Sequence, residues 1–154
     1  MKKIKLTQNK YALVDNEDYP ILSMFNWYAN KNKTHRTFYA VRVNGNKKIH
    51  MHRYILGTPK GMETDHIDGN GLNNQKKNLR ICDHAENQRN KDKPKNNTSG
   101  FKGVSWCERN KKWLVRISLD RERIYLGHFK SKMKAYEAYC KGCIKYHGKF
   151  AKLK

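Results

Sequence analysis

An acidic residue, a histidine and two asparagines lie close together in the middle of the sequence, at Asp65, His66, Asn78 and Asn87. Carboxylate and amide oxygens are ligands that Mg²⁺ and Mn²⁺ accept, and a neutral imidazole near pH 7 can take a proton from water. Hydrolysis of a phosphodiester needs a nucleophilic water, charge neutralisation at phosphorus and a stabilised leaving oxygen. Residues of these types can therefore hold one divalent metal ion, Mg²⁺ or Mn²⁺, beside one general base.

Local patterns predict a strand, a polar loop and a second strand around the first three of these residues. The strands are predicted at 64–67 and 78–82. Between them, the stretch 68–71 has the sequence DGNG, in which both glycines can adopt positive φ. The other polar residues nearby are interpreted as turn formers or as the start of a helix: Asp68, Asn73, Asn74 and His84.

A helix is predicted directly after the second strand. Asp83 is a favourable N-cap, and Glu86 three residues later completes a capping box. The helix is expected to run from about His84 to Asn90 and to carry Asn87. The acid and the histidine would then come from a strand and the amide from a helix that folds back on it.

This order and spacing resemble HNH endonucleases of the phage and intron-encoded homing type. Asn78 follows His66 by twelve positions, and Asn87 follows Asn78 by nine. The resemblance implies that His66 is the general base and that Asp65 and Asn87 are the metal ligands. It also implies that Asn78 fixes the loop and the orientation of His66 by hydrogen bonding to the backbone.

The same resemblance implies a ββα-metal nuclease motif and a site-selective endonuclease that nicks one strand of duplex DNA per site. Asn87 stands at the third letter of the motif, where many members have His. That variant also occurs within the family, and it weakens zinc binding more than it weakens catalysis.

The composition points to a polyanionic partner. The 154 residues include 34 Lys and Arg against 13 Asp and Glu, a formal net charge of +21. Self-repulsion on this scale disfavours a compact fold unless a polyanion neutralises it. Double-stranded DNA is the expected partner, ahead of a charged membrane surface, and no protein partner is indicated.

The sequence also bears on the compartment. No stretch approaches the ~20 apolar residues of a membrane span, and the start, MKKIKLTQNK, lacks the apolar run of a signal peptide. A cytoplasmic location is therefore expected, in a bacterial host cell if the protein is phage-encoded.

The charge is unevenly distributed along the chain. The first 57 residues carry 11 basic and 3 acidic groups, the next 36 carry 7 and 6, and the last 61 carry 16 and 4. The flanks therefore look suited to hold phosphate, while the middle keeps the acids that a metal centre needs. We divide the chain into a supporting α+β segment at 1–57, a nuclease motif at 58–93, a linker at 94–97 and a DNA-binding domain at 98–154.

The segment 1–57 is predicted to form an aromatic-rich α+β layer. Asp15 and Asp18 resemble a capping box, so a brief helix ending at Leu22 or Phe25 is expected. His50 and His52 are interpreted as packing or phosphate-contacting residues, because no acid lies nearby in sequence. The other expected elements are strands at 4–6, 11–14, 27–29, 38–43 and 47–50, with a hairpin at Asn44-Gly45 and a helical turn at 51–56.

Beyond the linker, apolar and polar residues alternate, which predicts three antiparallel strands with one buried face. A helix over 132–146, ended by Gly148, is expected to cover that face. The whole chain is therefore expected to belong to the α+β class. The inward residues would be Val104, Trp106, Trp113, Val115, Ile117, Ile124 and Leu126.

The four cysteines do not form two paired clusters. Cys140 and Cys143, with His147 four residues later, make at most half of a four-ligand zinc site. Cys82 and Cys107 are far away in sequence, so all four are interpreted as small buried hydrophobic residues.

The outward face of the predicted sheet is suited to DNA, where Arg reads guanine edges and other side chains hold phosphate. The motifs GVSWCERNKKWLVRI, YLGHF and KAYEAY resemble the ethylene-response-factor (APETALA-type) DNA-binding domain. Ser105, Cys107 and Ser118 stand where the plant domains tend to place Arg, so the base preference does not carry over. The expected DNA-binding residues are Ser105, Arg109, Lys112, Arg116, Ser118, Arg123 and Tyr125.

Two other functions remain open on the sequence. The first is a non-catalytic DNA-binding regulator that retains a nuclease-like fold. The second is an RNA-binding protein that stacks bases on exposed aromatic residues. Cleavage of DNA that depends on His66 separates the nuclease from both.

Overall fold

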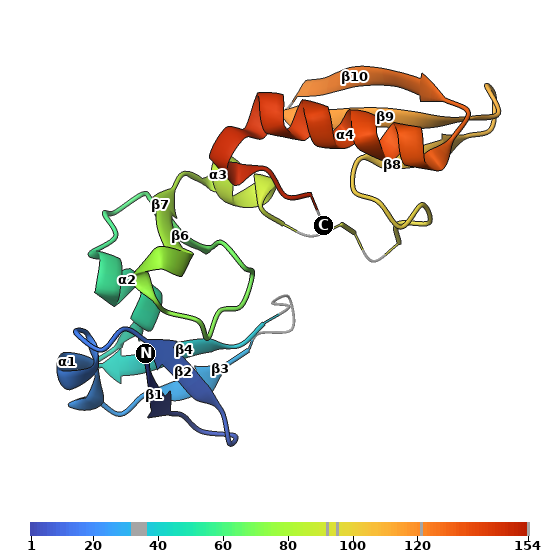
Figure 1. The fold of residues 1–154 in the computed structure, drawn as a ribbon. Helices are drawn as coiled ribbons and strands as arrows, with labels where there is room; N and C mark the ends of the chain where they lie inside the picture. Colours follow the sequence, from blue (N-terminus) through green and yellow to red (C-terminus); the bar gives the residue numbers. More distant parts are fainter. Residues whose placement is uncertain (32–36, 92, 95, 121, 154) are drawn as a thin grey trace. The chain divides into compact units, whose positions relative to one another are not determined.

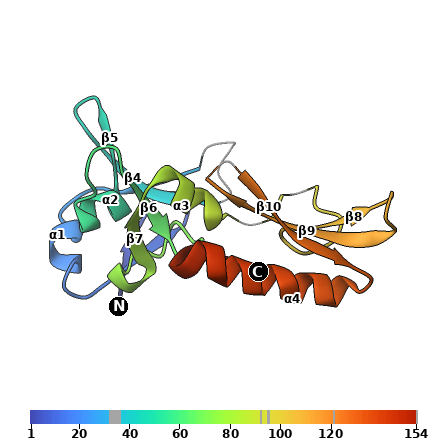
Figure 2. The ribbon, with the colours of Figure 1, turned by 90° about the horizontal axis from the view of Figure 1, so that it is seen from above.

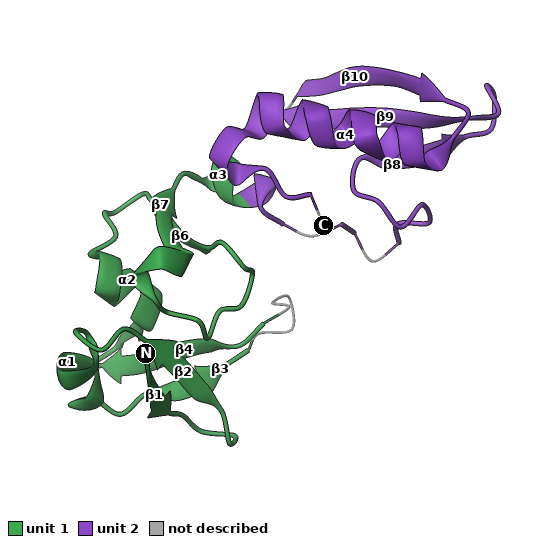
Figure 3. Ribbon diagram, viewed as in Figure 1, with its two compact units in different colours: residues 1–87 green, residues 88–154 purple. Residues whose placement is uncertain are grey.

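The computed structural model describes residues 1–31, 37–91, 93–94, 96–120 and 122–153. The chain is mixed α and β, and its contacts divide it into two compact units, residues 1–87 and residues 88–154 (Figure 3). Of the expected linker at 94–97, Lys95 lies outside the described residues. Among the described residues, no helix combines the length and apolar character that crossing a bilayer requires.

The first unit begins with an antiparallel hairpin and a three-stranded antiparallel sheet in the order β3-β4-β5 (Figure 1). The turn between β4 and β5 projects from the rest of this unit (Figure 2). Its elements are β1 (Lys2–Lys5), β2 (Tyr11–Val14), α1 (Tyr19–Ser23), β3 (Tyr28–Asn30), β4 (Tyr39–Asn44), β5 (Lys47–His50) and α2 (Met51–Leu56).

Apolar side chains from these elements form one core, which includes Val14, Leu22, Trp27, Ala40 and Met51. The alternation in β1 and β2 sends one face of the hairpin into this core, as the sequence pattern predicts. The predicted Asn44-Gly45 turn is confirmed by the pairing of β4 with β5.

The expected capping box at α1 is wrong. The helix begins at Tyr19, and its N-cap Asp18 makes no side-chain cap hydrogen bond. Asp15 instead accepts hydrogen bonds from the backbone nitrogen of Lys76, at 2.8 Å, and from Nε2 of Gln75, at 3.2 Å. Because the Asp15 carboxylate accepts hydrogen bonds from the loop at residues 75–76, it does not cap α1.

The nuclease stretch contributes the last elements of the first unit. They are β6 (Glu63–His66), a 3₁₀ turn (Lys76–Asn78), β7 (Leu79–Cys82) and α3 (His84–Arg89), which continues into the second unit. β6 and β7 pair antiparallel. Both strands and the helix agree with the predicted elements to within one residue at each end.

The second unit is a three-stranded antiparallel sheet in the order β10-β9-β8, with a long helix along one face (Figure 1). This confirms the predicted sheet and helix. The elements are β8 (Val104–Cys107), β9 (Lys112–Leu119), β10 (Glu122–Phe129), α4 (Lys132–His147) and a final 3₁₀ turn (Gly148–Phe150).

The core of this unit lies between the sheet and α4. Val115, Ile117 and Tyr139 are almost fully buried. Trp106 departs from the predicted burial: its side chain packs against Trp113 but is 40 % exposed. Leu114 is buried although it points to the opposite face of β9.

Gly103 permits close contact between the sheet and α4. Its φ is +71°, and a Cβ there would overlap the Tyr139 ring and lie 2.7 Å from the carbonyl oxygen of Arg116. We expect Gly103→Ala to destabilise the second unit by roughly 1–3 kcal/mol of overpacking beyond the cost of positive φ. Gly100→Ala is the control, because Gly100 has φ +82° but open space around it.

Hydrogen exchange at the amides of Val115 and Ile117 measures this difference. Equal acceleration in the Gly103 and Gly100 variants would show that backbone conformation, and not the Tyr139 contact, explains the glycine.

Candidate active site

Asp65 lies on β6 directly opposite Arg80 of β7. The Nε and Nη2 atoms of Arg80 both donate to Oδ2 of Asp65, at 2.8 Å and 2.6 Å. Asp65 is 6 % exposed, so this charged pair is shielded from solvent. A buried carboxylate paired with a guanidinium keeps a fixed orientation, because separating the two would leave an unpaired buried charge.

The capping box that positions Asn87 is confirmed. The backbone nitrogen of Glu86 donates to Oδ1 of Asp83 at 2.8 Å, and the nitrogen of Asp83 donates to Oε2 of Glu86 at 3.0 Å. Asn87 lies in the next helical position, and its Nδ2 donates to Oε2 of Glu63 on β6. The helix therefore places its amide against the strand that carries Asp65.

His66 is buried and bonded within the loop. Its Nε2 lies 3.3 Å from Oδ1 of Asn74. Because an amide oxygen only accepts, this contact places the imidazole proton on Nε2 and the lone pair on Nδ1. Burial lowers the pKa of His66, although Asn74 and the carboxylates of Asp68 and Asp65 act in the opposite direction. The ring is therefore neutral near pH 7, as a general base requires.

His52 packs against His66, and His50 packs against His52. The ring of His52 lies 4.9 Å from that of His66, nearly perpendicular to it, and 5.2 Å from that of His50. Tyr39 contacts all three imidazoles, with centroid distances of 5.5 to 6.1 Å. Of the two predicted roles, packing or phosphate contact, packing has specific partners: His52 packs against the candidate general base, and His50 packs against His52 and Tyr39.

Asn78 closes the loop between β6 and β7. Its Oδ1 accepts from the backbone nitrogen of Asp68 at 3.1 Å, and its Nδ2 donates to the carbonyl oxygen of Asn73 at 2.8 Å. Nδ2 also donates to Oδ1 of Asp68, at 3.0 Å. Burial alone would raise the pKa of Asp68, but these and other hydrogen bonds lower it. The contacts hold the loop that leaves His66.

The N-terminal hairpin supports the same loop. The backbone of Leu13 in β2 accepts from Asn74 and donates to the carbonyl oxygen of Leu72, both at 2.8 Å. The backbone nitrogen of Gly71 donates to Oγ1 of Thr37 at 3.1 Å. The loop that contacts His66 is therefore held by segments far away in sequence.

The low pKa of His52 predicts that acid destabilises the first unit. Burial is the main cause that lowers its pKa from 6.5 to about 2, and the charges of His66, His50 and Arg53 act in the same direction. The unfolded chain binds a proton below pH 6.5 that the folded chain does not, so stability falls as the pH falls. From pH 7 to pH 5 we expect a loss of about 2 kcal/mol from this group alone.

Urea unfolding followed by the NMR signals of Ala40 and Val41 measures that loss. His52→Phe should reduce the pH dependence, because the titrating group is gone while a planar ring remains. An unchanged dependence in the variant would contradict the assignment of the effect to His52.

The donor set around Asn87 fits a hard divalent cation. Glu63 and Asp65 leave the same face of β6, and Asn87 reaches that face through its bond to Glu63. With Nδ2 bonded to Glu63, the oxygen is the atom of this amide that could hold a metal ion. Within the described ranges, no three His, Cys, Asp or Glu side chains gather closely enough to hold a metal ion. A site made from one carboxylate and one amide does not need such a cluster.

The second unit brings together the residues predicted to bind DNA on the face of the sheet opposite α4. Arg116 pairs with Tyr125, and Ser118 pairs with Arg123, across β9 and β10. The hydroxyl of Tyr125 lies 2.7 Å from Nδ1 of His128. Ser105 and Lys112 project to this face from β8 and β9, while Arg109 lies in the turn between those strands.

Cys143 and His147 have structural contacts in the second unit. His147 lies 3.5 Å from Sγ of Cys143 through Nδ1 and 2.9 Å from the carbonyl oxygen of Ser118 through Nε2. Burial lowers the pKa of His147. These contacts join α4 to β9.

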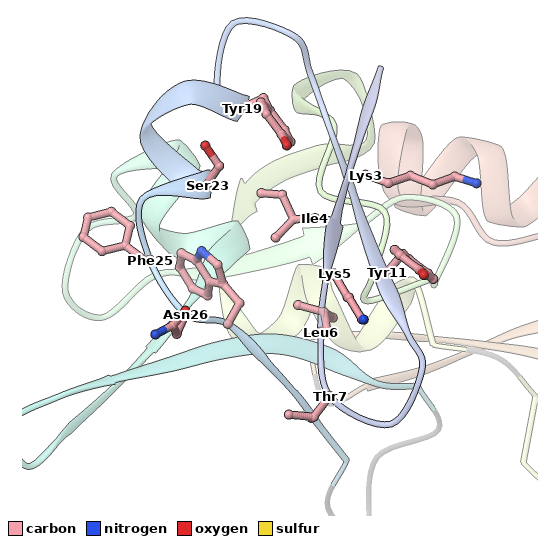
Figure 4. Close-up of a pocket in the computed structure, with 11 residues that line it drawn as sticks. Lys3, Ile4, Lys5, Leu6, Thr7, Tyr11, Tyr19, Ser23, Phe25 and Asn26 are labelled. Carbon is pink, nitrogen blue, oxygen red and sulfur yellow. The ribbon is translucent and has the colours of Figure 1, made fainter.

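A cavity of about 590 Å³ lies beside β1, away from these residues (Figure 4). Lys3, Ile4, Tyr19, Phe25 and Trp27 are among the side chains that line it. None of the predicted catalytic or metal-binding residues lines this cavity.

Sequence reasoning missed several residues around the candidate site: Tyr39, Glu63, Asn74 and Arg80. Only Glu63 had a usable signal, since it precedes Asp65 by two positions and shares its strand face. Strand register places Arg80 opposite Asp65, the loop places Asn74 beside His66, and contact between distant segments places Tyr39 there.

Comparison with known proteins finds similarity in the part of the chain that carries the candidate site. Residues 47–89 match the family model for the HNH endonuclease. Protein 3.8 of Escherichia phage T7 is 45 % identical over 62 residues, which cover 40 % of this chain and 51 % of that protein. The Uncharacterized HNH endonuclease L560 of Acanthamoeba polyphaga mimivirus is 32 % identical over 106 residues, which cover 65 % of this chain and 51 % of that protein.

The chain thus spans about half the length of these curated relatives. No solved structure matches it. The family match ends at residue 89, so the resemblance of residues 98–154 to the ethylene-response-factor domain stays a prediction. The match supports a similarity between residues 47–89 and the HNH endonuclease domain.

Proposed function

We propose that this chain is a metal-dependent, site-selective endonuclease that hydrolyses phosphodiester bonds in duplex DNA. The observation that carries the proposal is the contact between β6 and α3 through Glu63 and Asn87. Asp65 and His66 come from the strand and Asn87 from the capped helix, which is the order expected of a ββα-metal site. The family match over residues 47–89 supports it.

In the proposed reaction His66 acts on the attacking water. The water gives a proton to Nδ1 of His66, its oxygen bonds to phosphorus, and the bond from phosphorus to one ester oxygen breaks. That leaving oxygen takes a proton from solvent. The hydrogen bond between His66 and Asn74 keeps the ring oriented, and burial keeps it neutral.

Asp65 and Asn87 would hold Mg²⁺ or Mn²⁺. Such an ion, when bound, neutralises charge on the phosphate and stabilises the leaving oxygen. Arg80 fixes the Asp65 carboxylate through Oδ2. Asn78 holds the loop and thereby the path of the chain at His66.

The outer face of the second sheet would bind the DNA that flanks the cut. Arg116 and Arg123 are exposed there beside the half-exposed ring of Tyr125. We infer a DNA-binding domain similar to the ethylene-response-factor type, with Ser105, Arg109, Lys112 and Ser118 completing the surface.

One observation favours a second function. Arg80 neutralises Asp65, which suits a DNA-binding regulator that retains a nuclease-like fold without a working metal site. One assay distinguishes the two functions. The endonuclease converts supercoiled plasmid to nicked or linear DNA, and the regulator does not.

The full chain is incubated with plasmid and Mg²⁺ or Mn²⁺, beside a sample with a chelator and beside His66→Ala. Nicking that requires the metal and is lost in the variant supports the endonuclease. Tight DNA binding without cleavage in every sample favours the regulator. Preference for RNA over duplex DNA in competition contradicts both.

A further inference from the structure

Glu63 has a place beside the candidate site that the catalytic scheme does not use. It precedes Asp65 by two residues on β6, so the two Cα atoms lie about 7 Å apart along one strand face. Its Oε2 accepts from Nδ2 of Asn87, and its Oε1 lies 2.8 Å from Nδ1 of His84. One carboxylate therefore joins the first strand to two positions on α3.

We propose that Glu63 is a positioning residue that fixes the Asn87 amide so that Oδ1, and not Nδ2, faces a divalent cation. This inference rests on the proposed function, because it assigns Glu63 to the ligand of the same site.

The two ends of an amide group differ in chemistry but hardly in shape. Oxygen and nitrogen have nearly the same shape, so rotation by 180° exchanges them at little steric cost, but only the oxygen binds a metal ion. An ionised carboxylate only accepts hydrogen bonds and therefore selects Nδ2. With Nδ2 bonded to Glu63, the amide oxygen of Asn87 is directed away from that carboxylate.

The second contact of Glu63, with His84, lies on the exposed side of the carboxylate. His84 and Asn87 are three residues apart on α3 and lie on one helix face. The contact with His84 is exposed, and the His84 side chain is itself 75 % exposed, whereas the contact of Glu63 with Asn87 is partly buried. Both carboxylate oxygens are used in contacts with the helix, which favours a positioning role over a third metal ligand.

The test measures Mn²⁺ affinity of the full chain by isothermal titration calorimetry, without DNA. We expect E63Q to weaken binding about tenfold, because its amide offers a donor as well as an acceptor and no longer selects one orientation of Asn87. N87D should also weaken binding, because it sets two carboxylates against each other.

The E63Q/N87D pair is the decisive variant. It restores one hydrogen bond with donor and acceptor exchanged and keeps an oxygen ligand at position 87. We expect its affinity to recover to within about threefold of the parent. A purely structural role for Glu63 predicts no such recovery. His84→Ala is the matched control and should change affinity less than about threefold, since it removes the exposed contact alone.

The NMR chemical shifts of the Asn87 side-chain amide protons, measured in the metal-free protein, give a second test of the role of Glu63. The amide protons should shift in E63Q and remain near their parent positions in His84→Ala. A parent that binds Mn²⁺ while E63Q binds equally well would overturn the role of Glu63 alone. A parent that binds neither Mn²⁺ nor Mg²⁺ would overturn the proposed function and, with it, this inference.

Discussion

Replacing His66 with alanine is expected to slow DNA cleavage about 10²- to 10⁴-fold, the range that a general base contributes. The variant loses the only group in the proposed scheme that accepts the proton of the attacking water. DNA affinity should change little, because His66 is 5 % exposed and the basic residues expected to hold phosphate lie elsewhere.

The measurement is a single-turnover cleavage rate with saturating Mn²⁺, alongside a DNA dissociation constant with chelator present. His84→Ala is the control. It removes another histidine beside the site, and the His84 side chain is 75 % exposed. Thermal unfolding of each variant separates a lost base from a lost fold. An equal loss of rate in both variants at unchanged stability would contradict the role given to His66.

DNA affinity is expected to fall about 10³-fold between 50 and 200 mM salt if roughly six phosphates are neutralised. The physical reason is the release of counterions from DNA when Lys and Arg replace them. The excess of 34 basic over 13 acidic residues makes such a number of contacts reasonable. A plot of the logarithm of affinity against the logarithm of salt concentration measures the slope.

Variants of the second unit locate the contacts. Removing two charges with Arg116→Gln and Arg123→Gln should lower the slope by about 2 if both hold phosphate. Lys134→Gln and Lys141→Gln remove the same charge from exposed positions on α4, the helix on the opposite face of the sheet. A slope that falls equally in both pairs would show that net charge, and not the outer face of the sheet, determines the salt dependence.

Chemistry and DNA binding are expected to depend on different residues. The buried histidine of the first unit would perform the chemistry, and the exposed sheet of the second unit would hold DNA. His66→Ala should therefore lose cleavage and keep the salt slope. Arg116→Gln with Arg123→Gln should lower the salt slope and leave the chemistry at His66 intact.

Several features followed from the sequence because short-range physics determines them. The capping box at Asp83 and Glu86 needs only four consecutive residues, and it starts α3 as predicted. Alternation fixed the buried face of β9, where Val115 and Ile117 point toward α4. The turn at Asn44-Gly45 was predictable for the same reason.

A local pattern failed where a distant partner competed for the same group. Asp15 and Asp18 have the spacing of a capping box, yet Asp15 bonds to Gln75 and Lys76. The carboxylate satisfies backbone and side-chain donors that approach it only after the loop has folded onto the hairpin. Nothing within four residues of Asp15 indicates those donors.

The sequence by itself determined which residues could perform the chemistry: the types and spacing of Asp65, His66 and Asn87, and the strand and helix that carry them. Only the tertiary structure decided what surrounds them. Arg80 faces Asp65 through strand register, and His52 reaches His66 through the packing of α2 near β6. Such partners depend on where distant segments meet, and burial there, rather than residue type, is what lowers the pKa of His66.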